Sequence, residues 1–227
     1  MTIDLHVHTS EISRCADICG ADVIKLYREK TAFDAVVVTN HINSAFFSEK
    51  MSPGDWKSKI EWYINGYKIA AEAGEREGLT VLFGCELCID SMASDYLLYG
   101  VTEDFLKEYV NLNKMKLSEV SKVCRDAGVL LFQAHPFRDN MKISDPALLD
   151  GVEVCNGHKD HNSRNAFAKL WADCYGLLKS AGSDFHHLGN EGRAGIVTSA
   201  PLADEKALTD VLKSGDFLIL EPTERGY

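Results

Sequence analysis

Two histidines near the N-terminus, His6 and His8, are the first residues whose type and spacing could do chemistry. They alternate with Ile3, Leu5 and Val7 in the period-two pattern of a β-strand. Residues two apart in a strand project from the same face, so both imidazoles point to one side. Two imidazoles held side by side form half of a transition-metal site. An edge strand with its polar residues in solvent would show the same pattern, and recurrence of ligand-type residues distinguishes the two interpretations.

Ligand-type residues do recur, each at the end of another apolar run. They are His41 after the run 34–39, Glu86 after 81–85, His135 after 130–134, and Asp184 and His186 after 177–183. Five of the eight histidines are thus joined by two carboxylates. Without a metal, converging neutral imidazoles would leave several acceptors unpaired, at roughly 1–3 kcal/mol each. The spacing of Asp184 and His186 repeats the same-face spacing of the first pair, and Pro136 is expected to hold His135 extended.

Short apolar runs alternate with helical patterns along the whole chain, and these elements must position the ligands. Strands are expected at 1–8, 34–39, 79–85, 96–101, 129–134, 152–155, 177–181, 194–198 and 217–220, and helices around 23–27, 56–78, 117–128, 166–171 and 207–212. This alternation favours a parallel sheet covered by helices and closed into a barrel. No linker or repeat interrupts the chain, so residues 1–227 are expected to form a single α/β domain. Chemistry in such folds collects at the carboxyl ends of the strands.

The composition excludes several classes of function. With 45% hydrophobic and 26% charged residues, the chain has the make-up of a globular protein. The formal net charge of −10 argues against general nucleic-acid or acidic-membrane binding, although it is compatible with a local basic pocket. Met1 leads directly into the first strand and no apolar run reaches about 18 residues, so neither a signal peptide nor a membrane span is expected. The seven cysteines then indicate free thiols in the cytoplasm, and the pair Cys85 and Cys88 lacks the second pair that a structural zinc site requires.

As a set, these residues resemble the PHP (polymerase and histidinol phosphatase) superfamily. The matching motifs are Asp4-Leu-His-Val-His-Thr9, Thr39-Asn-His41, Gly84-Cys-Glu86, Ala134-His-Pro-Phe137 and Gly182-Ser-Asp-Phe-His186, with further similar segments at 95–100 and 152–156. They follow the family's order and cover nearly the whole chain. The resemblance implies a distorted TIM-like (β/α)7 barrel, two or three divalent metals at its carboxyl-end face, and a metal-dependent phosphoesterase.

The resemblance also implies a set of ligands. His6, His8, Glu86 and Asp184 would hold one metal, Glu86 would bridge to a second that His135 also binds, and His41 and His186 would hold a third.

This sequence departs from the family pattern at three places. Asn40 stands where the family usually has Asp, which could alter the orientation of His41. Glu11, Cys15 and Asp17 are alternatives for the ligand that the family places shortly after the His-x-His motif. A family histidine before the His-Pro motif is absent, and Asp95 or Thr102 lies nearest to its place.

Such a centre could support phosphate chemistry. Two metals about 3.5–4 Å apart lower the pKa of a bridging water and clamp both oxygens of an in-line displacement. Zinc, manganese and iron suit this mixture of imidazoles and carboxylates. Transition-state charge on the phosphate also needs a cation, for which Arg138 and Arg193 are candidates. His158 could contact the substrate or donate a proton, together with the nearby Asn156, Lys159 and His161, and a polar surface loop is the alternative for that segment.

These observations predict a phosphoesterase that hydrolyses a small phosphorylated metabolite or nucleotide through a metal-bridged hydroxide. A metal-dependent hydrolase of C–N or C–O bonds and a non-catalytic metal-binding module are the alternatives. Specificity is expected from the loops at 42–55, 87–95, 137–145 and 157–163.

Overall fold

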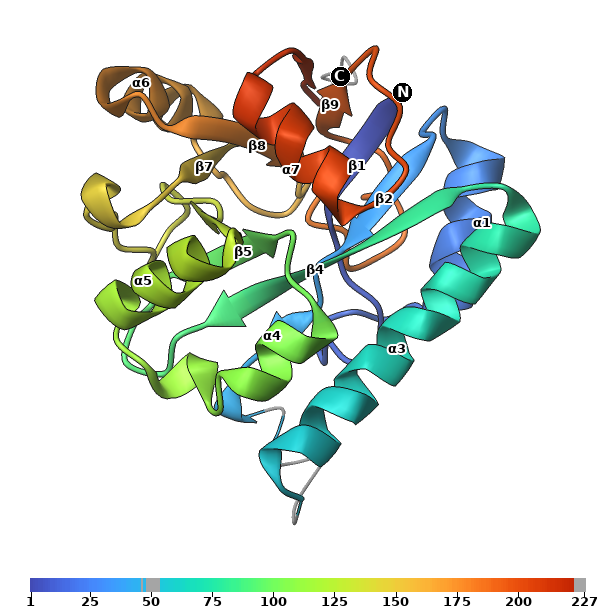
Figure 1. Ribbon diagram of the computed structural model, residues 1–227. Helices are drawn as coiled ribbons and strands as arrows, with labels where there is room; N and C mark the ends of the chain where they lie inside the picture. The colour runs from blue at the N-terminus through green and yellow to red at the C-terminus, as the bar shows by residue number, and fades with distance from the viewer. Residues whose placement is uncertain (46, 48–53, 223–227) are drawn as a thin grey trace.

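The computed structural model describes residues 1–45, 47 and 54–222, in which helices pack around one mixed β-sheet (Figure 1). Its strands are β1 (Thr2–Val7), β2 (Ala35–Val38), β3 (His41–Ile42), β4 (Thr80–Cys88), β5 (Asp95–Tyr99), β6 (Leu130–Gln133), β7 (Gly151–Asn156), β8 (Leu178–Gly182), β9 (Gly195–Val197) and β10 (Leu218–Leu220). Its helices are α1 (Gly20–Lys30), α3 (Trp56–Glu77), α4 (Glu103–Glu108), α5 (Leu117–Ala127), α6 (Asn165–Tyr175) and α7 (Glu205–Ser214), with 3₁₀ turns at Leu112–Lys114 and Pro146–Leu148.

The sheet curls until its last strand meets its first. The strand order is β10-β9-β1-β2-β4-β5-β6-β7-β8, with β3 also paired to β4. Past the end of β8, the amide of His8 donates to the carbonyl of Phe185 (3.0 Å) and the amide of Phe185 donates to that of His6 (3.2 Å). The sheet is therefore a nearly closed barrel, which confirms the predicted distorted TIM-like α/β fold.

The expectation of a parallel sheet is wrong at two places. β5 runs antiparallel to both β4 and β6, and β9 runs antiparallel to β1 and β10. The connection from β4 to β5 covers only residues 89–94, whereas a parallel crossover needs about a dozen residues or more. A strand does form where the pattern of 96–101 predicts one, as β5. Its direction is set by the short loop before it, and the alternating pattern carries no information about direction.

The predicted helices form where their apolar faces meet the sheet. In α3, the Asp55 carboxylate accepts from the Ser58 amide (2.8 Å), and the helix ends at Gly78, which has a φ of 69°. Its buried residues Ile60 and Tyr63 belong to the largest core cluster, and α3 lies alongside α1 (Figure 1). None of the helices in the described part of the chain has the length and apolar content that crossing a membrane requires.

Closure of the barrel depends on Gly182 at the end of β8. A Cβ at this position would lie 2.4 Å from the Cβ of His6 and 2.5 Å from its backbone nitrogen. Only glycine therefore lets β8 approach β1 this closely, directly beside the first ligand-type histidine.

Gly182→Ala is expected to lower the free energy of unfolding of the metal-free protein by about 1–3 kcal/mol, because the added methyl group overpacks the contact with β1. Urea unfolding followed by circular dichroism measures the change. Gly78→Asn is the matched control, since nothing lies within 4 Å of an added Cβ there and asparagine tolerates a positive φ. Equal stability of Gly182→Ala and the wild type would contradict this account of the closure.

Candidate metal centre

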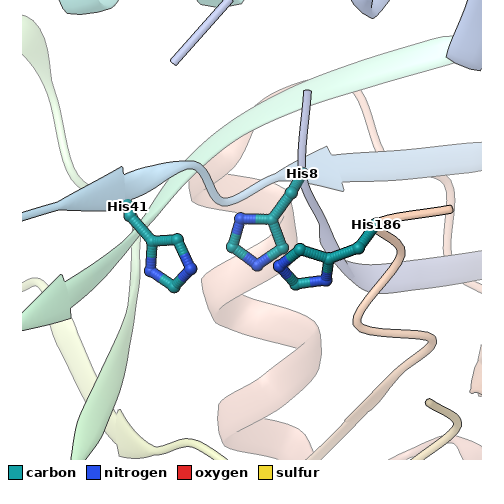
Figure 2. Close-up of side chains that lie close together, drawn as sticks. All are labelled: His8, His41 and His186. Carbon is teal, nitrogen blue, oxygen red and sulfur yellow. The ribbon is translucent and has the colours of Figure 1, made fainter. Parts of the chain in front are cut away.

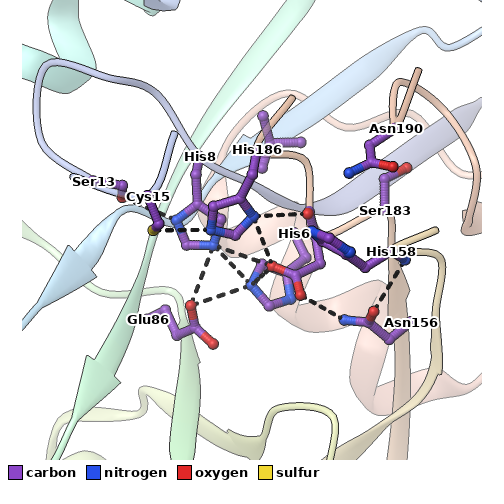
Figure 3. A network of polar contacts seen from close by, with 12 residues as sticks. His6, His8, Ser13, Cys15, Glu86, Asn156, His158, Ser183, His186 and Asn190 are labelled. Atoms are coloured by element: carbon purple, nitrogen blue, oxygen red, sulfur yellow. Dashed lines mark hydrogen bonds and ion pairs between the residues drawn. The ribbon is translucent and has the colours of Figure 1, made fainter. Parts of the chain in front are cut away.

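Four buried side chains converge at the carboxyl-end mouth of the barrel: His6 in β1, His8 directly after it, Glu86 in β4 and Asp184 after β8. Figure 3 shows His6, His8 and Glu86 pointing towards one another. The Nε2 atoms of His6 and His8 are 3.0 Å apart. Oε2 of Glu86 lies 3.3 Å from the His6 nitrogen and 3.2 Å from the His8 nitrogen. Oδ1 of Asp184 lies 3.3 Å and 3.5 Å from the same two atoms. The structure thus gathers the four residues that the resemblance implies for one metal.

Hydrogen bonds at Nδ1 of His6 and His8 determine whether the Nε2 atom of each neutral ring carries a hydrogen or a lone pair. Nδ1 of His6 is 2.9 Å from the Glu153 carboxylate, and Nδ1 of His8 is 3.0 Å from the hydroxyl of Ser13. That hydroxyl already donates to Oδ1 of Asn40 (2.9 Å), so it accepts from His8. In a neutral ring with its proton on Nδ1, the Nε2 atom carries a lone pair. Each ring in this neutral form would direct a lone pair towards the other, as metal binding requires. Although burial opposes it, the carboxylates of Asp184 and Glu86 raise the pKa of both rings.

This arrangement fits a divalent cation. Ligands at the usual Zn–N and Zn–O distances of about 2.0–2.1 Å form a tetrahedron with edges of about 3.3–3.4 Å, close to the contacts among the four side chains. Both oxygens of Glu86 are fully buried and make no hydrogen bond with the described residues. Such orphaned acceptors cost roughly 1–3 kcal/mol each, more when charged, unless a cation binds them.

The carboxylates hold their charge despite burial. Burial alone would raise the pKa of Glu86, but the charge of His6, whose own pKa is raised, outweighs it and holds the pKa of Glu86 well below its usual range. The pKa of Asp184 is likewise lowered, against burial, by His6 and by Arg138. Burial lowers the pKa of His41 to about 4, which keeps its imidazole in the neutral form that binds metals.

A second group of ligand-type atoms adjoins the other oxygen of Glu86. Its Oε1 lies 3.2 Å from Nε2 of His135, and Asp95 is close enough to both to share an ion with them. The sequence pointed to Asp95 only because it lies near the place of the missing family histidine. Thr102, the other residue near that place, caps α4 by accepting from the Phe105 amide.

The expectation that His135 is extended is wrong. Its φ is 27°, in the left-handed region. Its amide donates to Oε2 of Glu153 (2.9 Å), and this buried bond fixes a backbone conformation that the following proline does not determine.

A third group stacks at the rim. The ring of His8 lies 4.5 Å from that of His41 and 4.2 Å from that of His186 (Figure 2). Of the three alternatives after the first motif, Cys15 reaches this group, with Sγ 3.1 Å from Nε2 of His186.

The other two alternatives are engaged elsewhere. Glu11 accepts from the amide of Gly20 at the start of α1 (2.9 and 3.0 Å), and Asp17 contacts Nδ1 of His187 (2.7 Å).

Two residues that support the site, Glu153 and Ser13, were not predicted from the sequence. Glu153 contacts His6 and His135 and also accepts from Asn156 (3.0 Å), and Ser13 links His8 to Asn40. The available signal was an acidic residue inside the buried apolar strand 152–155. Asn40 does not touch His41 by its side chain; it accepts from the Thr9 amide (2.8 Å) and so fixes the loop that carries Ser13.

A cavity of about 350 Å³ opens onto these groups, and we call it the central cavity. Its lining is Cys15, His41, Glu86, Asp95, His135, Arg138, His158, Asp160, His161, Asp184, His186 and His187. Nη2 of Arg138 donates to Oδ2 of Asp184 (2.5 Å) and to Oδ1 of Asn156 (2.9 Å). Arg138 and His158 thus lie at the cluster, whereas Arg193 does not line this cavity.

Comparisons with known proteins agree with this geometry. The family model described as PHP-associated matches residues 162–217. A two-domain protein from Bacteroides vulgatus, described as containing a predicted PHP-like metal-dependent phosphoesterase, has a TM-score of 0.70 at 15% identity, over 98% of this chain and 65% of that one. The family model thus matches one C-terminal segment of the chain, and the structural likeness at 15% identity concerns the fold. A search of curated protein sequences finds no match.

Two further solved structures share the fold and are described with different activities. One, from Bifidobacterium adolescentis, carries the proposed activity of a metal-dependent phosphoesterase; it has a TM-score of 0.53 at 18% identity, over 93% of this chain and 95% of that one. Endonuclease Q from Pyrococcus furiosus, a lesion-specific endonuclease, has a TM-score of 0.61 at 12% identity, over 96% of this chain and 57% of that one. At these identities the likeness concerns the fold, and the present chain spans about two thirds of the B. vulgatus protein.

Glu153→Gln is expected to weaken metal binding about 10- to 100-fold, the usual effect of losing a carboxylate that orients a ligating histidine. The amide would place a donor against one of the three donors that Glu153 now accepts from. Competition with a chromophoric chelator measures the affinity, with the exposed Glu72→Gln as control. Unchanged retention of metal in Glu153→Gln would show that the carboxylate does not orient His6.

Proposed function

We propose that this chain belongs to the PHP superfamily and is a metal-dependent phosphoesterase that hydrolyses a small phosphorylated metabolite or nucleotide. The observation that carries the proposal is the pair of Nε2 atoms of His6 and His8, 3.0 Å apart and bracketed by two ionised carboxylates. His6, His8, Glu86 and Asp184 would hold one divalent ion, and Glu86, Asp95 and His135 a second. His41 and His186 with Cys15 would hold a third.

Zinc, manganese and iron match these imidazole and carboxylate donors. Bound there, such ions would supply Lewis-acid charge to phosphate oxygens and lower the pKa of a water. The remaining chemistry falls to the chain itself.

Arg138 is placed to bind a phosphate oxygen beside the metal ligands. Its guanidinium is held by Asp184 and Asn156, and its buried Nε has no hydrogen-bond partner among the described residues. The guanidinium fork suits phosphate recognition, and a side chain already fixed loses little entropy on binding. Arg138 would thus neutralise charge that develops on the phosphate.

His158 would act as a hydrogen-bond donor. Its Nδ1 accepts from the backbone amide of Asp160 (3.2 Å), so the neutral ring carries its hydrogen on Nε2. Burial lowers the pKa of His158 to about 4, and the ring stays neutral at physiological pH. It would therefore orient a substrate or leaving-group oxygen and would not store a proton for it.

The central cavity is small, about 350 Å³, which favours a compact substrate or a single nucleotide. The acidic chain also disfavours extended contacts with a nucleic-acid backbone. Hydrolysis of a C–N or C–O bond and metal binding without turnover are the outcomes that would replace the proposal. The cytoplasmic location expected from the free thiols stays a prediction.

Metal-depleted protein reloaded with Mn²⁺, Zn²⁺ or Fe²⁺ is expected to hydrolyse phosphate esters in preference to carboxylic amides. Asp184→Asn and His135→Ala should abolish turnover while circular dichroism stays unchanged, because each removes a ligand without altering the barrel. The exposed Asp173→Asn should retain wild-type activity. Amide hydrolysis alone, or wild-type activity in both ligand variants, would contradict the proposal.

Arg138→Ala is expected to lower kcat/KM for a phosphate ester about 100- to 1000-fold, as loss of one transition-state donor does elsewhere. Arg138→Lys should recover only part of this, because an ammonium cannot form a bidentate contact. Metal content is measured on the same samples, since Arg138 also contacts Asp184. Full activity in Arg138→Ala with normal metal content would exclude the phosphate contact.

A further inference from the structure

A second cavity opens beside the central cavity, and we call it the side recess. Its volume is about 600 Å³, and it is lined by Asn156, Gly157, His158, Lys159, Asp160, His161, Asn162, Ser163, Arg164, Asn165, Arg193 and Pro222. The two cavities share His158, Asp160 and His161. A molecule bound at the metal centre can therefore extend past the two histidine rings, whose centroids are 4.6 Å apart, into the recess.

Two cations of the recess are held in place without being neutralised. Nζ of Lys159 donates to the carbonyl of Leu188 (2.9 Å), and Nε of Arg193 donates to the carbonyl of Gly157 (2.7 Å). A carbonyl anchors a cation but leaves its full charge and its other N–H donors. Within the described residues, neither side chain has a carboxylate at ion-pair distance. Arg164, the third cation, is by contrast paired with Asp139 (2.5 Å).

The wall between the cavities is rigid and tied to the metal centre. Oδ1 of Asn156 accepts from Arg138 (2.9 Å), from the amide of His158 (3.1 Å) and from the hydroxyl of Ser163 (3.2 Å). Nδ2 of the same side chain donates to Asp184 (3.2 Å). Figure 3 shows the contact between Asn156 and His158. The recess is thus positioned against the ligands by buried hydrogen bonds.

The charge of this recess is opposite to that of the whole protein. The chain carries a formal net charge of −10, yet the recess presents two unpaired cations and one carboxylate, Asp160. The side-chain amide of Asn162 adds a neutral donor to the lining. A site of this kind favours an anionic group that can accept several hydrogen bonds at once.

We propose that the side recess is a subsite for a second anionic group, a phosphate or a carboxylate, on the molecule whose phosphate ester is cleaved at the metal centre. Lys159 and Arg193 bind this group, and the neutral His158 lies at the junction between the two subsites. The inference rests on the proposed function and adds the substrate class: phosphate esters with a second anion. Arg193 then serves specificity, which explains why it lies one cavity away from the metal ligands.

Three probes test the subsite on the metal-loaded protein: glycerol 1-phosphate with one anionic group, 3-phosphoglycerate with an added carboxylate, and 1,3-propanediol bisphosphate with an added phosphate. The wild type is expected to show a kcat/KM at least tenfold higher for one or both doubly anionic probes, mainly through a lower KM. The better of the two identifies the second group.

In the double variant Lys159→Met/Arg193→Met, the ratio of kcat/KM between the doubly and singly anionic probes should fall towards one. Lys122→Met, which removes an exposed cation on α5, should leave this ratio unchanged. Equal kcat/KM for all three probes, or a preference unchanged in the double variant, would overturn the subsite. Hydrolysis of none of them would instead count against the proposed function. In that case, calorimetry of the same probes tests the recess separately. If the subsite exists, the doubly anionic probes must still bind more weakly to the double variant than to the wild type.

Discussion

The structure depends on one crowded contact among two imidazoles and two carboxylates. The Nε2 atoms of His6 and His8 lie 3.0 Å apart, and the ionised carboxylates of Glu86 and Asp184 face the same point. On the far side of each ring, Nδ1 meets a buried oxygen, that of Glu153 or Ser13. The carboxylates raise the pKa of both rings, so this point attracts positive charge, and the barrel holds the four side chains around it.

The barrel explains how residues distant in sequence reach one point. β1 and the residue after it supply two candidate ligands, His6 and His8, because alternate residues share a face. β4 brings Glu86, and the segment after β8 returns Asp184 to β1 through the Phe185 bridge. The close approach at Gly182 is therefore part of the site, since a larger residue would separate the ends of the sheet that carry ligands.

The sequence predicted which ligand-type residues come together better than it predicted their support. The convergence of His6, His8, Glu86 and Asp184 was recognisable because metal-binding residue types follow apolar runs, and a parallel arrangement places the ends of such runs together. The direction of β5 was not recognisable in this way, because its alternating pattern is the same for either direction. The positive φ of His135 was hidden for a related reason: a hydrogen bond to Glu153, eighteen positions away, sets it.

The role of Glu153 and the distinction among Glu11, Cys15 and Asp17 could not be predicted either. All three alternatives have ligand-type side chains within a short segment, and the contacts that each one makes depend on residues distant in the sequence. Glu11 meets an amide at the start of α1, Asp17 meets His187, and Cys15 is left to face His186. Glu153 resembles any acidic residue in a strand until the fold places His6 and His135 on either side of it.

Asn156 connects the two charge patterns of this face. The metal centre concentrates negative side chains that cations would offset, while the recess beside it concentrates positive side chains that an anion would offset. Asn156 lines the recess, and its amide accepts from Arg138 at one end and donates to Asp184 at the other. A neutral side chain with both donor and acceptor can join these regions without favouring either charge, whereas aspartate would repel Asp184 and lysine would compete with Arg138. The amide at this position therefore keeps Arg138 directed at the metal centre without adding a charge to the recess.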